Sequence, residues 1–207
     1  MGKGERHWKK GYSAYELAHC WLGAADGVPE RIRVVLDQSK SWQGAELLEA
    51  FFELETDLRS KGRPSQTDLL GLFRLSGGLG VLAVEDKVEE PFGPLVDERL
   101  ADGSPSKRRR LEVLCEAVDL APENTKPLRY QLLHRAAAAL FEAERYRASE
   151  AIMLVHSFSR SGSWYDDFAR FSEALGLLAE GPNQVSGERF FGKTTMRLAW
   201  VGDEPQP

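Results

Sequence analysis

Two charged residues near the middle of the chain stand where charge is unusual. Glu85 and Lys87 close an apolar run, residues 79–84, which predicts a strand that helices cover on both faces. Because side chains alternate along a strand, Glu85 and Lys87 point to the same side of the sheet. Charges at the end of a buried strand are costly unless they pair or bind a metal. This position is therefore a candidate site.

A third charged residue, Asp68, lies seventeen positions before Glu85. It precedes residues 69–73, a run that predicts another strand, and Ser76-Gly77-Gly78 predicts the hairpin turn between the two strands. In an antiparallel pair the start of one strand lies beside the end of the other. We therefore expect Asp68 to lie close to Glu85 and Lys87.

An acidic residue on one strand, a hairpin and Glu-x-Lys at the end of the next strand resemble the PD-(D/E)XK nuclease superfamily, which has the restriction-endonuclease-like fold. Thr67 rather than proline precedes Asp68, so the resemblance rests on Asp68, Glu85 and Lys87 and covers approximately residues 43–158. It implies a metal-dependent nuclease. The segments SWQGAELLEAFF, VEDKVEEPFG and RYQLLH are also similar to a group of uncharacterised bacterial proteins, a likeness that implies no activity.

The chemistry of these groups favours a hard divalent cation. Two carboxylates about 4 Å apart repel by roughly 4 kcal/mol at an effective dielectric constant of 20, so a bound cation would stabilise them. Oxygen ligands without histidine or cysteine select Mg²⁺ or Mn²⁺ over zinc. We expect Asp68 and Glu85 to bind the metal and Lys87 to orient the attacking water or stabilise the phosphorane. The hypothesis is phosphodiester hydrolysis in DNA.

A further metal ligand is expected just upstream. Residues 43–56 combine a broad apolar face with four glutamates and predict an amphipathic helix. Nuclease relatives place an acid on the helix before the aspartate strand, and Glu49 matches that position, with Glu46 as the alternative on the same face. The other interpretation is that all four glutamates lie on the surface.

The longest helical signal, residues 128–146, supplies two more candidates. In several branches of the resembled superfamily this helix carries a glutamine near its start that reaches the site, and Gln131 matches that pattern. Arg135 lies four residues later on the same helix face and could contact a phosphate. The alternative is a surface glutamine on a core helix.

The basic run at residues 107–110 opens another predicted helix, residues 107–120. It is either a solvated helix start or a phosphate clamp beside the site, with Arg108 and Arg109 as nucleic-acid contacts. A net charge of −5 argues against a broadly basic nucleic-acid-coating surface but allows one basic groove.

The remaining elements complete an α/β fold. We expect helices at residues 13–22, 29–38 and 164–178, a buried strand at 150–158 that runs parallel to the Glu85 strand after a long crossover, and one or two strands within 188–200 at the sheet edge. The predicted fold is a restriction-endonuclease-like core, with a central mixed β-sheet flanked by helices. We expect residues 1–42 to form an N-terminal arm and a helical extension of the same domain, and residues 43–207 to form its nuclease-like part.

The length and composition suit one domain, at 207 residues of which 42% are hydrophobic. The start lacks a signal-peptide pattern and no run of eighteen apolar residues occurs, so we expect a cytoplasmic protein that contacts no membrane. Cys20 and Cys115 are far apart without a CxxC motif and are expected to be buried thiols. His156, with no acid beside it in sequence, is expected to be structural.

Three functional hypotheses stay open. The first is a magnesium-dependent nuclease acting on DNA, for which a homodimer is one arrangement. The second is a non-catalytic nucleic-acid-binding or assembly protein on a nuclease-like fold, which predicts no magnesium dependence. The third treats Glu85 and Lys87 as a structural ion pair in an unrelated α/β enzyme. The sequence contains no P-loop, dinucleotide-binding glycine motif or G-x-S-x-G motif to specify such an enzyme.

Overall fold

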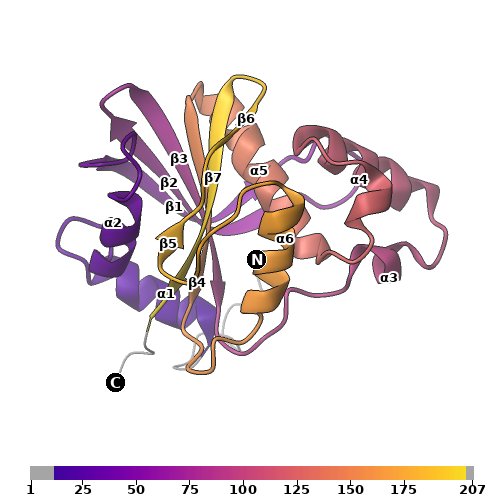
Figure 1. The fold of residues 1–207 in the computed structure, drawn as a ribbon, viewed down its shortest axis with the longest axis horizontal. Coiled ribbons are helices and arrows are strands. Elements are labelled where there is room, and N and C mark those ends of the chain that lie inside the picture. The colour runs from indigo at the N-terminus through magenta and orange to yellow at the C-terminus, as the bar shows by residue number, and fades with distance from the viewer. Residues whose placement is uncertain (1–11, 204–207) are drawn as a thin grey trace.

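The computed structural model describes residues 12–203 and forms one mixed sheet with helices on both faces (Figure 1). The seven strands are ordered β1-β2-β3-β4-β7-β5, and β6 also pairs with β7. The elements in chain order are α1 (Ser13–Leu22), α2 (Glu30–Leu36), β1 (Glu46–Thr56), β2 (Ser65–Leu75), β3 (Gly78–Lys87), α3 (Val96–Leu100), α4 (Pro105–Ala117), the 3-10 helix η1 (Pro122–Thr125), α5 (Tyr130–Tyr146), β4 (Glu150–Ser157), α6 (Tyr165–Ala174), β5 (Gln184–Val185), β6 (Arg189–Phe191) and β7 (Thr194–Gly202).

The central hairpin forms as the sequence predicts. Strands β2 and β3 pair antiparallel through a two-residue turn, with Leu75 opposite Gly78 and Leu69 opposite Val84. Strand β4 then lies parallel to β3, which requires the long crossover that contains α3, α4 and α5. The chain therefore brings the carboxyl ends of β3 and β4 to the same edge of the sheet.

Each face of the sheet packs against its own set of helices. Val81 and Ala83 of β3 face α5, whose four consecutive alanines, residues 136–139, are fully buried and allow close packing. Leu82 and Val84 face the opposite layer, which α1 and α2 cover. Figure 1 shows α1 and α2 on one side of the sheet and α5 and α6 on the other. Burial of both faces explains why β3 has no polar alternation before Glu85.

The predicted helix at residues 43–56 is wrong, because this segment is the edge strand β1. Its apolar residues do not alternate: the register with β2 shifts between Leu47 and Glu49, and Glu53 has a positive φ of 52°. The more buried positions Leu47, Phe51 and Leu54 are consequently four and three apart. Irregularities in a strand thus reproduced the spacing of a helix face.

We expected the strands within residues 188–200 to lie at the edge of the sheet. This prediction is wrong for β7, the longer of the two strands in this segment. β7 lies between β4 and β5, and its residues from Thr194 to Val201 are buried. Its final run, Leu198-Ala199-Trp200-Val201, is continuously apolar, which is typical of an interior parallel strand.

Helices α1 and α2 belong to the same core as the sheet. Leu17 and Trp21 of α1 and Ile32 of α2 pack with Leu82 and Val84 of β3.

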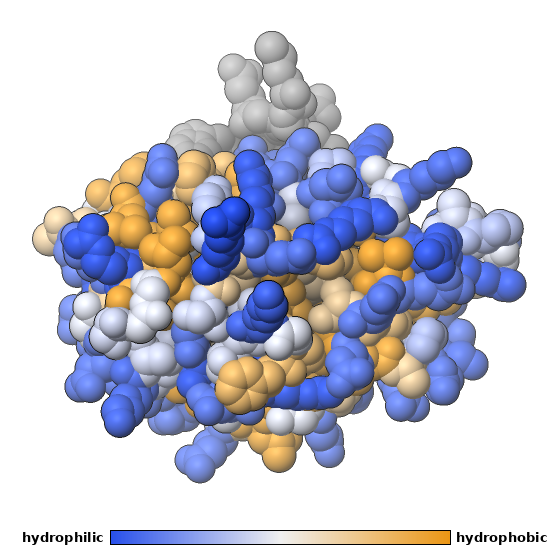
Figure 2. All heavy atoms as spheres, turned by 90° about the horizontal axis from the view of Figure 1, so that it is seen from above, coloured by the Kyte–Doolittle hydropathy of each residue, from blue (hydrophilic) through white to orange (hydrophobic). Residues whose placement is uncertain are grey.

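Most of the predicted arm, namely residues 1–11, lies outside the described residues. Within the described range 12–203, none of the helices has the length and apolarity that crossing a membrane requires. One face of the molecule carries mostly polar side chains around smaller apolar groups (Figure 2).

Candidate functional site

Asp68 and Glu85 lie on neighbouring strands at the same level of the sheet. The pairing of Leu69 with Val84 places them one step further along β2 and β3. The Asp68 carboxylate also accepts a hydrogen bond of 2.9 Å from the backbone N–H of Asp86. The expected proximity of the two acids is therefore present.

The Glu85 carboxylate is the centre of the cluster. It is only 2% exposed, and Lys87 Nζ lies 2.6 Å from its Oε1. The Gln131 side-chain amide donates to the same oxygen, and the Arg135 guanidinium donates to Oε2. The three donors come from β3 and α5, two elements separated by more than forty residues of chain. Asp68, Glu85, Lys87 and Gln131 thus meet as the sequence predicts.

Arg135 contacts both acids. Besides donating to Glu85, its Nη2 lies 3.9 Å from Asp68 Oδ1. Its Nη1 donates to Ser65 Oγ over 2.9 Å, and the residue is 7% exposed. A residue expected to contact phosphate is instead the counter-charge of the two carboxylates in this structure.

The electrostatics divide the acids into two kinds. Burial disfavours the charge of Glu85, but Arg135 and Lys87 outweigh burial and lower its pKa to about 2. Burial and the neighbouring Glu85 raise the pKa of Asp68 well above its usual range, and they raise the pKa of Asp86 to about 7. Glu85 therefore stays ionised, while Asp68 and Asp86 are protonated more readily than ordinary aspartates.

Glu49 does not reach this cluster, which corrects its expected role as a metal ligand. It is exposed on β1 and pairs with Leu72, four residues from Asp68 along β2, which is roughly 13 Å at about 3.3 Å per residue. The alternative, Glu46, forms an exposed ion pair of 3.0 Å with Arg74. The error follows from taking β1 as a helix, which would have turned different residues inward.

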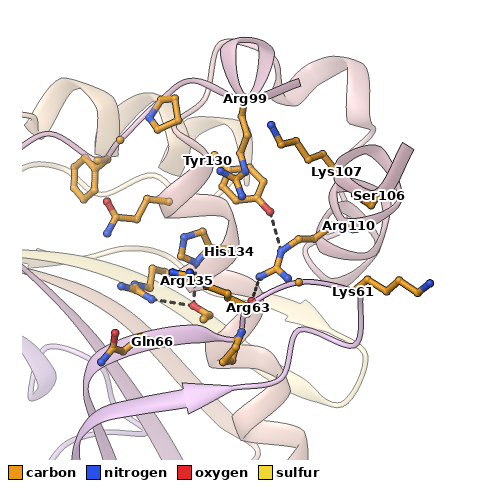
Figure 3. A pocket seen from close by; sticks show the side chains of 17 residues that line it. Lys61, Arg63, Gln66, Arg99, Ser106, Lys107, Arg110, Tyr130, His134 and Arg135 are labelled. Carbon is orange, nitrogen blue, oxygen red and sulfur yellow. Dashed lines mark hydrogen bonds between the residues drawn. The ribbon is translucent and has the colours of Figure 1, made fainter. Parts of the chain in front are cut away.

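A cavity of about 490 Å³ opens beside the cluster (Figure 3). Among the described residues that line it, six side chains are cationic and none is acidic. It extends from the loop before β2 across α4 to the first turns of α5. The residues that line it are Lys61, Gly62, Arg63, Pro64, Ser65, Gln66, Phe92, Gly93, Pro94, Arg99, Ser106, Lys107, Arg110, Tyr130, Gln131, His134 and Arg135.

Contacts within the wall hold several of these cations in place. Arg110 donates to the Tyr130 hydroxyl over 3.1 Å and to the backbone oxygen of Arg63 over 2.6 Å. The guanidinium of Arg99 lies 4.2 Å from the centroid of the Tyr130 ring. Figure 3 shows these side chains gathered around the cavity. Arg135 is paired with Glu85 and Lys107 with Asp102, but the preorganised Arg99 and Arg110 still make this cavity suited to an anion.

His134 contributes shape rather than charge to the cavity. Its Nδ1 lies 2.9 Å from Ser65 Oγ. Burial, and next Arg135, lower the pKa of His134 to about 3, so the ring is neutral near pH 7.

In the basic run at residues 107–110, some side chains line the cavity and others face solvent. Lys107 and Arg110, three apart and so on one helix face, line the cavity. Arg108 and Arg109 do not line it, and Arg109 pairs with Glu112 over 2.9 Å on the surface. Arg108 and Arg109, the expected nucleic-acid contacts, are therefore outside the cavity, and the side chains of this run that line it are Lys107 and Arg110.

Sequence reasoning missed Lys61, Arg63 and Arg99 as lining residues. A signal existed for the first two, because they precede Asp68 in a glycine- and proline-containing loop at the mouth of the expected site. Arg99 carried no signal, since it reaches the cavity only because α3 lies near the start of α5. The backbone bridge between Leu95 and Arg129 joins these two regions.

The fold and site define an α/β protein with a seven-stranded mixed sheet, a buried cluster of acids and cations at the strand ends, and an adjoining cationic cavity. The chain belongs to the family described as domain of unknown function (DUF6946), whose model matches residues 1–205. No curated protein and no solved structure matches the chain.

Proposed function

We propose that this protein is a metal-dependent nuclease of the PD-(D/E)XK type that hydrolyses phosphodiester bonds in DNA. The observation that carries the proposal is the meeting of Asp68, Glu85, Lys87 and Gln131 next to a cavity lined by six cations and no acids. When α2, α3, α4 and η1 are treated as additions, the remaining order α1-β1-β2-β3-α5-β4 is that of an αβββαβ restriction-endonuclease-like core, which supports the proposal. In this order β1, which the sequence predicted as a helix, is the first of the three consecutive strands.

The donors fit Mg²⁺ or Mn²⁺ in type. Asp68 and Glu85 offer carboxylate oxygens, and Mg²⁺ commonly takes only one or two carboxylates and keeps several waters. A bound ion would act as a Lewis acid toward the phosphate and lower the pKa of a coordinated water. Glu85 must exchange its contact with Arg135 for the ion, so Arg135 would be released when the metal binds.

The side chains of the chain itself divide the remaining tasks. Lys87 supplies an ammonium beside Glu85, where it can stabilise negative charge that develops on the phosphorane. Gln131 can hold a water through its amide once that amide leaves Glu85. Asp68, which accepts a hydrogen bond from the backbone of Asp86 beside Glu85, would be a ligand of the ion, and the proton of the attacking water would leave to solvent. The cavity cations then position the phosphates that flank the cleaved bond.

Two measurements test this function together. Titration with Mg²⁺ or Mn²⁺ by calorimetry should show binding to the native protein and to the Glu49→Ala control, and a loss of binding in Asp68→Ala. Cleavage of end-labelled single- and double-stranded DNA should require the metal and should fall by at least about 100-fold in Lys87→Met. Equal heats of metal binding in the native and Asp68→Ala proteins would refute the metal site.

A second function, nucleic-acid binding without catalysis, is favoured by the position of Arg135. Its guanidinium neutralises both acids without a metal, and Glu85 and Lys87 are almost completely buried. Under this function the cluster fixes α5 against β3, and only the cavity contacts the ligand. DNA binding would then be unchanged by chelation of divalent ions and by Lys87→Met, and no cleavage would occur with Mg²⁺ or Mn²⁺.

A further inference from the structure

A second cluster of metal-ligating atoms lies away from the acidic site. The side chains of Cys20 on α1, His156 near the end of β4 and Asp203 directly after β7 converge at one point. Cys20 Sγ lies 3.8 Å from Asp203 Oδ2, and His156 Nε2 lies 3.4 Å from the same oxygen. One ligand atom from each residue lies within 4.8 Å of the other two.

The topology of the sheet creates this convergence. Strands β4 and β7 are parallel neighbours, with Ser157 opposite Gly202, so both end at the same edge. His156 shares the face of Leu154, which packs in the core beneath α1 and α2. Glu85 shares the opposite face with Val81 and Ala83. The cluster is therefore separated from the cationic cavity by the sheet itself.

Two of the three spacings between the ligand atoms are close to those of tetrahedral coordination. With zinc–sulfur, zinc–nitrogen and zinc–oxygen bonds of ordinary length, the nitrogen and oxygen ligands lie about 3.4 Å apart and the sulfur and oxygen ligands about 3.6 Å apart. The observed separations are 3.4 Å and 3.8 Å, and the ligand atoms of Cys20 and His156 lie within 4.8 Å of each other. An ion bound by all three side chains would fix that last separation at about 3.6 Å.

We propose that Cys20 Sγ, His156 Nε2 and Asp203 Oδ2 bind a zinc-class divalent metal ion. A thiolate, an imidazole and one carboxylate together select zinc and similar transition metals over Mg²⁺. The site is therefore distinct in its metal preference from Asp68 and Glu85.

The surroundings of the cluster support this role. Arg31 Nε lies 3.3 Å from Asp203 Oδ1, and Arg31 Nη1 donates to the backbone oxygen of Gly202 over 3.2 Å. These contacts hold one carboxylate oxygen and leave Oδ2 as the oxygen that faces Cys20 and His156. Such an orienting partner is usual for carboxylates that bind metals. His156 is fully buried, so its ring is fixed by the packing around it.

Metal binding would join three distant parts of the chain. Cys20 lies on α1, His156 lies near the end of β4, and Asp203 directly follows β7. A bound ion would connect α1 to the ends of two central strands and should raise the thermal stability of the fold. The three protein ligands also leave a fourth position for water or another ligand.

Calorimetric titration with zinc tests the proposal, using the untagged full chain freed of metal by a chelator that is then removed. We expect one zinc per chain in the native protein and in the Cys115→Ser control, whose thiol lies outside the cluster. Binding should be lost in Cys20→Ser and Asp203→Asn. Arg31→Ala should weaken binding by about 10- to 100-fold.

Substitution with cobalt keeps the test decisive if a variant fails to fold. Co²⁺ bound to the native protein should give a thiolate-to-cobalt charge-transfer band and tetrahedral ligand-field bands in the visible spectrum. Absence of the charge-transfer band in the native protein would overturn the proposal. Zinc binding of equal affinity in folded Cys20→Ser would overturn it as well.

Discussion

Arg135 donates to the carboxylate of Glu85, and both side chains are almost fully buried. Removal of one member of a buried ion pair leaves an uncompensated charge and typically costs about 3–5 kcal/mol. We therefore expect Arg135→Met to lower the free energy of unfolding by roughly this amount, as measured by urea denaturation at pH 7. The matched control Arg109→Met breaks an exposed pair with Glu112 and should cost under about 1 kcal/mol. Similar losses in both variants would contradict the buried pairing.

The protonation of Asp86 should make stability depend on pH. Burial and Glu85 raise its pKa from the ordinary value of 3.8 to about 7 in the folded state. Between these two values the folded state binds more protons than the unfolded state, so the free energy of unfolding falls as pH rises. Asp86→Asn should remove this part of the fall.

The difference between native protein and Asp86→Asn measures Asp86 together with its coupling to Asp68, because the Asp86 charge also raises the pKa of Asp68. His134 has a lowered pKa and contributes a dependence of opposite sign, but it is present in both proteins. Urea denaturation at several values between pH 4 and 8 would give the two curves. Parallel curves across this range would show that Asp86 does not titrate as expected.

The cavity should bind DNA in a salt-dependent manner. Arg63 lines the cavity, and only its backbone oxygen is used by Arg110, so Arg63→Ala should leave the wall intact. The loss of one phosphate contact should lower the slope of log affinity against log salt concentration by about 0.7 to 0.9. Fluorescence anisotropy with labelled oligonucleotides at several salt concentrations measures this slope. The control Arg109→Ala, outside the cavity, should keep the native slope.

Gly80 of β3 should tolerate no side chain. A Cβ at this position would lie 2.8 Å from a ring carbon of the fully buried Trp42 and 2.9 Å from Leu75. Gly80→Ala should therefore destabilise the fold by about 1–3 kcal/mol through overpacking. In Gly77→Ala, where no atom lies within 4 Å, the free energy of unfolding should change little. Thermal unfolding followed by tryptophan fluorescence would distinguish the two.

The parts of the fold that the sequence predicted are those governed by local patterns. Ser76 and Gly77 identified the β2–β3 hairpin, and continuous apolar runs identified β3 and β4 as strands covered on both faces. The hairpin alone brought Asp68 beside Glu85. The two-residue period of a strand then placed the Lys87 side chain on the same side of the sheet as that of Glu85.

The parts that failed depend on irregular geometry or on distant residues. Strand β1 resembled a helix because its register shift at Glu49 broke the alternation. The proximity of Cys20, His156 and Asp203 depends on three elements far apart in the chain, and no motif joins them. Arg135 was placed correctly beside the site, but its partner could not be inferred, because a phosphate and a carboxylate attract a guanidinium equally well.

The acidic edge strand β1 has a consequence for self-association. An edge strand exposes unpaired backbone groups that can template pairing with another chain, and Leu48 and Phe52 are each 40% exposed on it. The neighbouring exposed glutamates Glu49 and Glu53 place negative charge along that edge and oppose its stacking against a second copy. Glu49, which sequence reasoning assigned to a metal, thus adds negative charge to an exposed edge strand, where it should disfavour fibrillar aggregation.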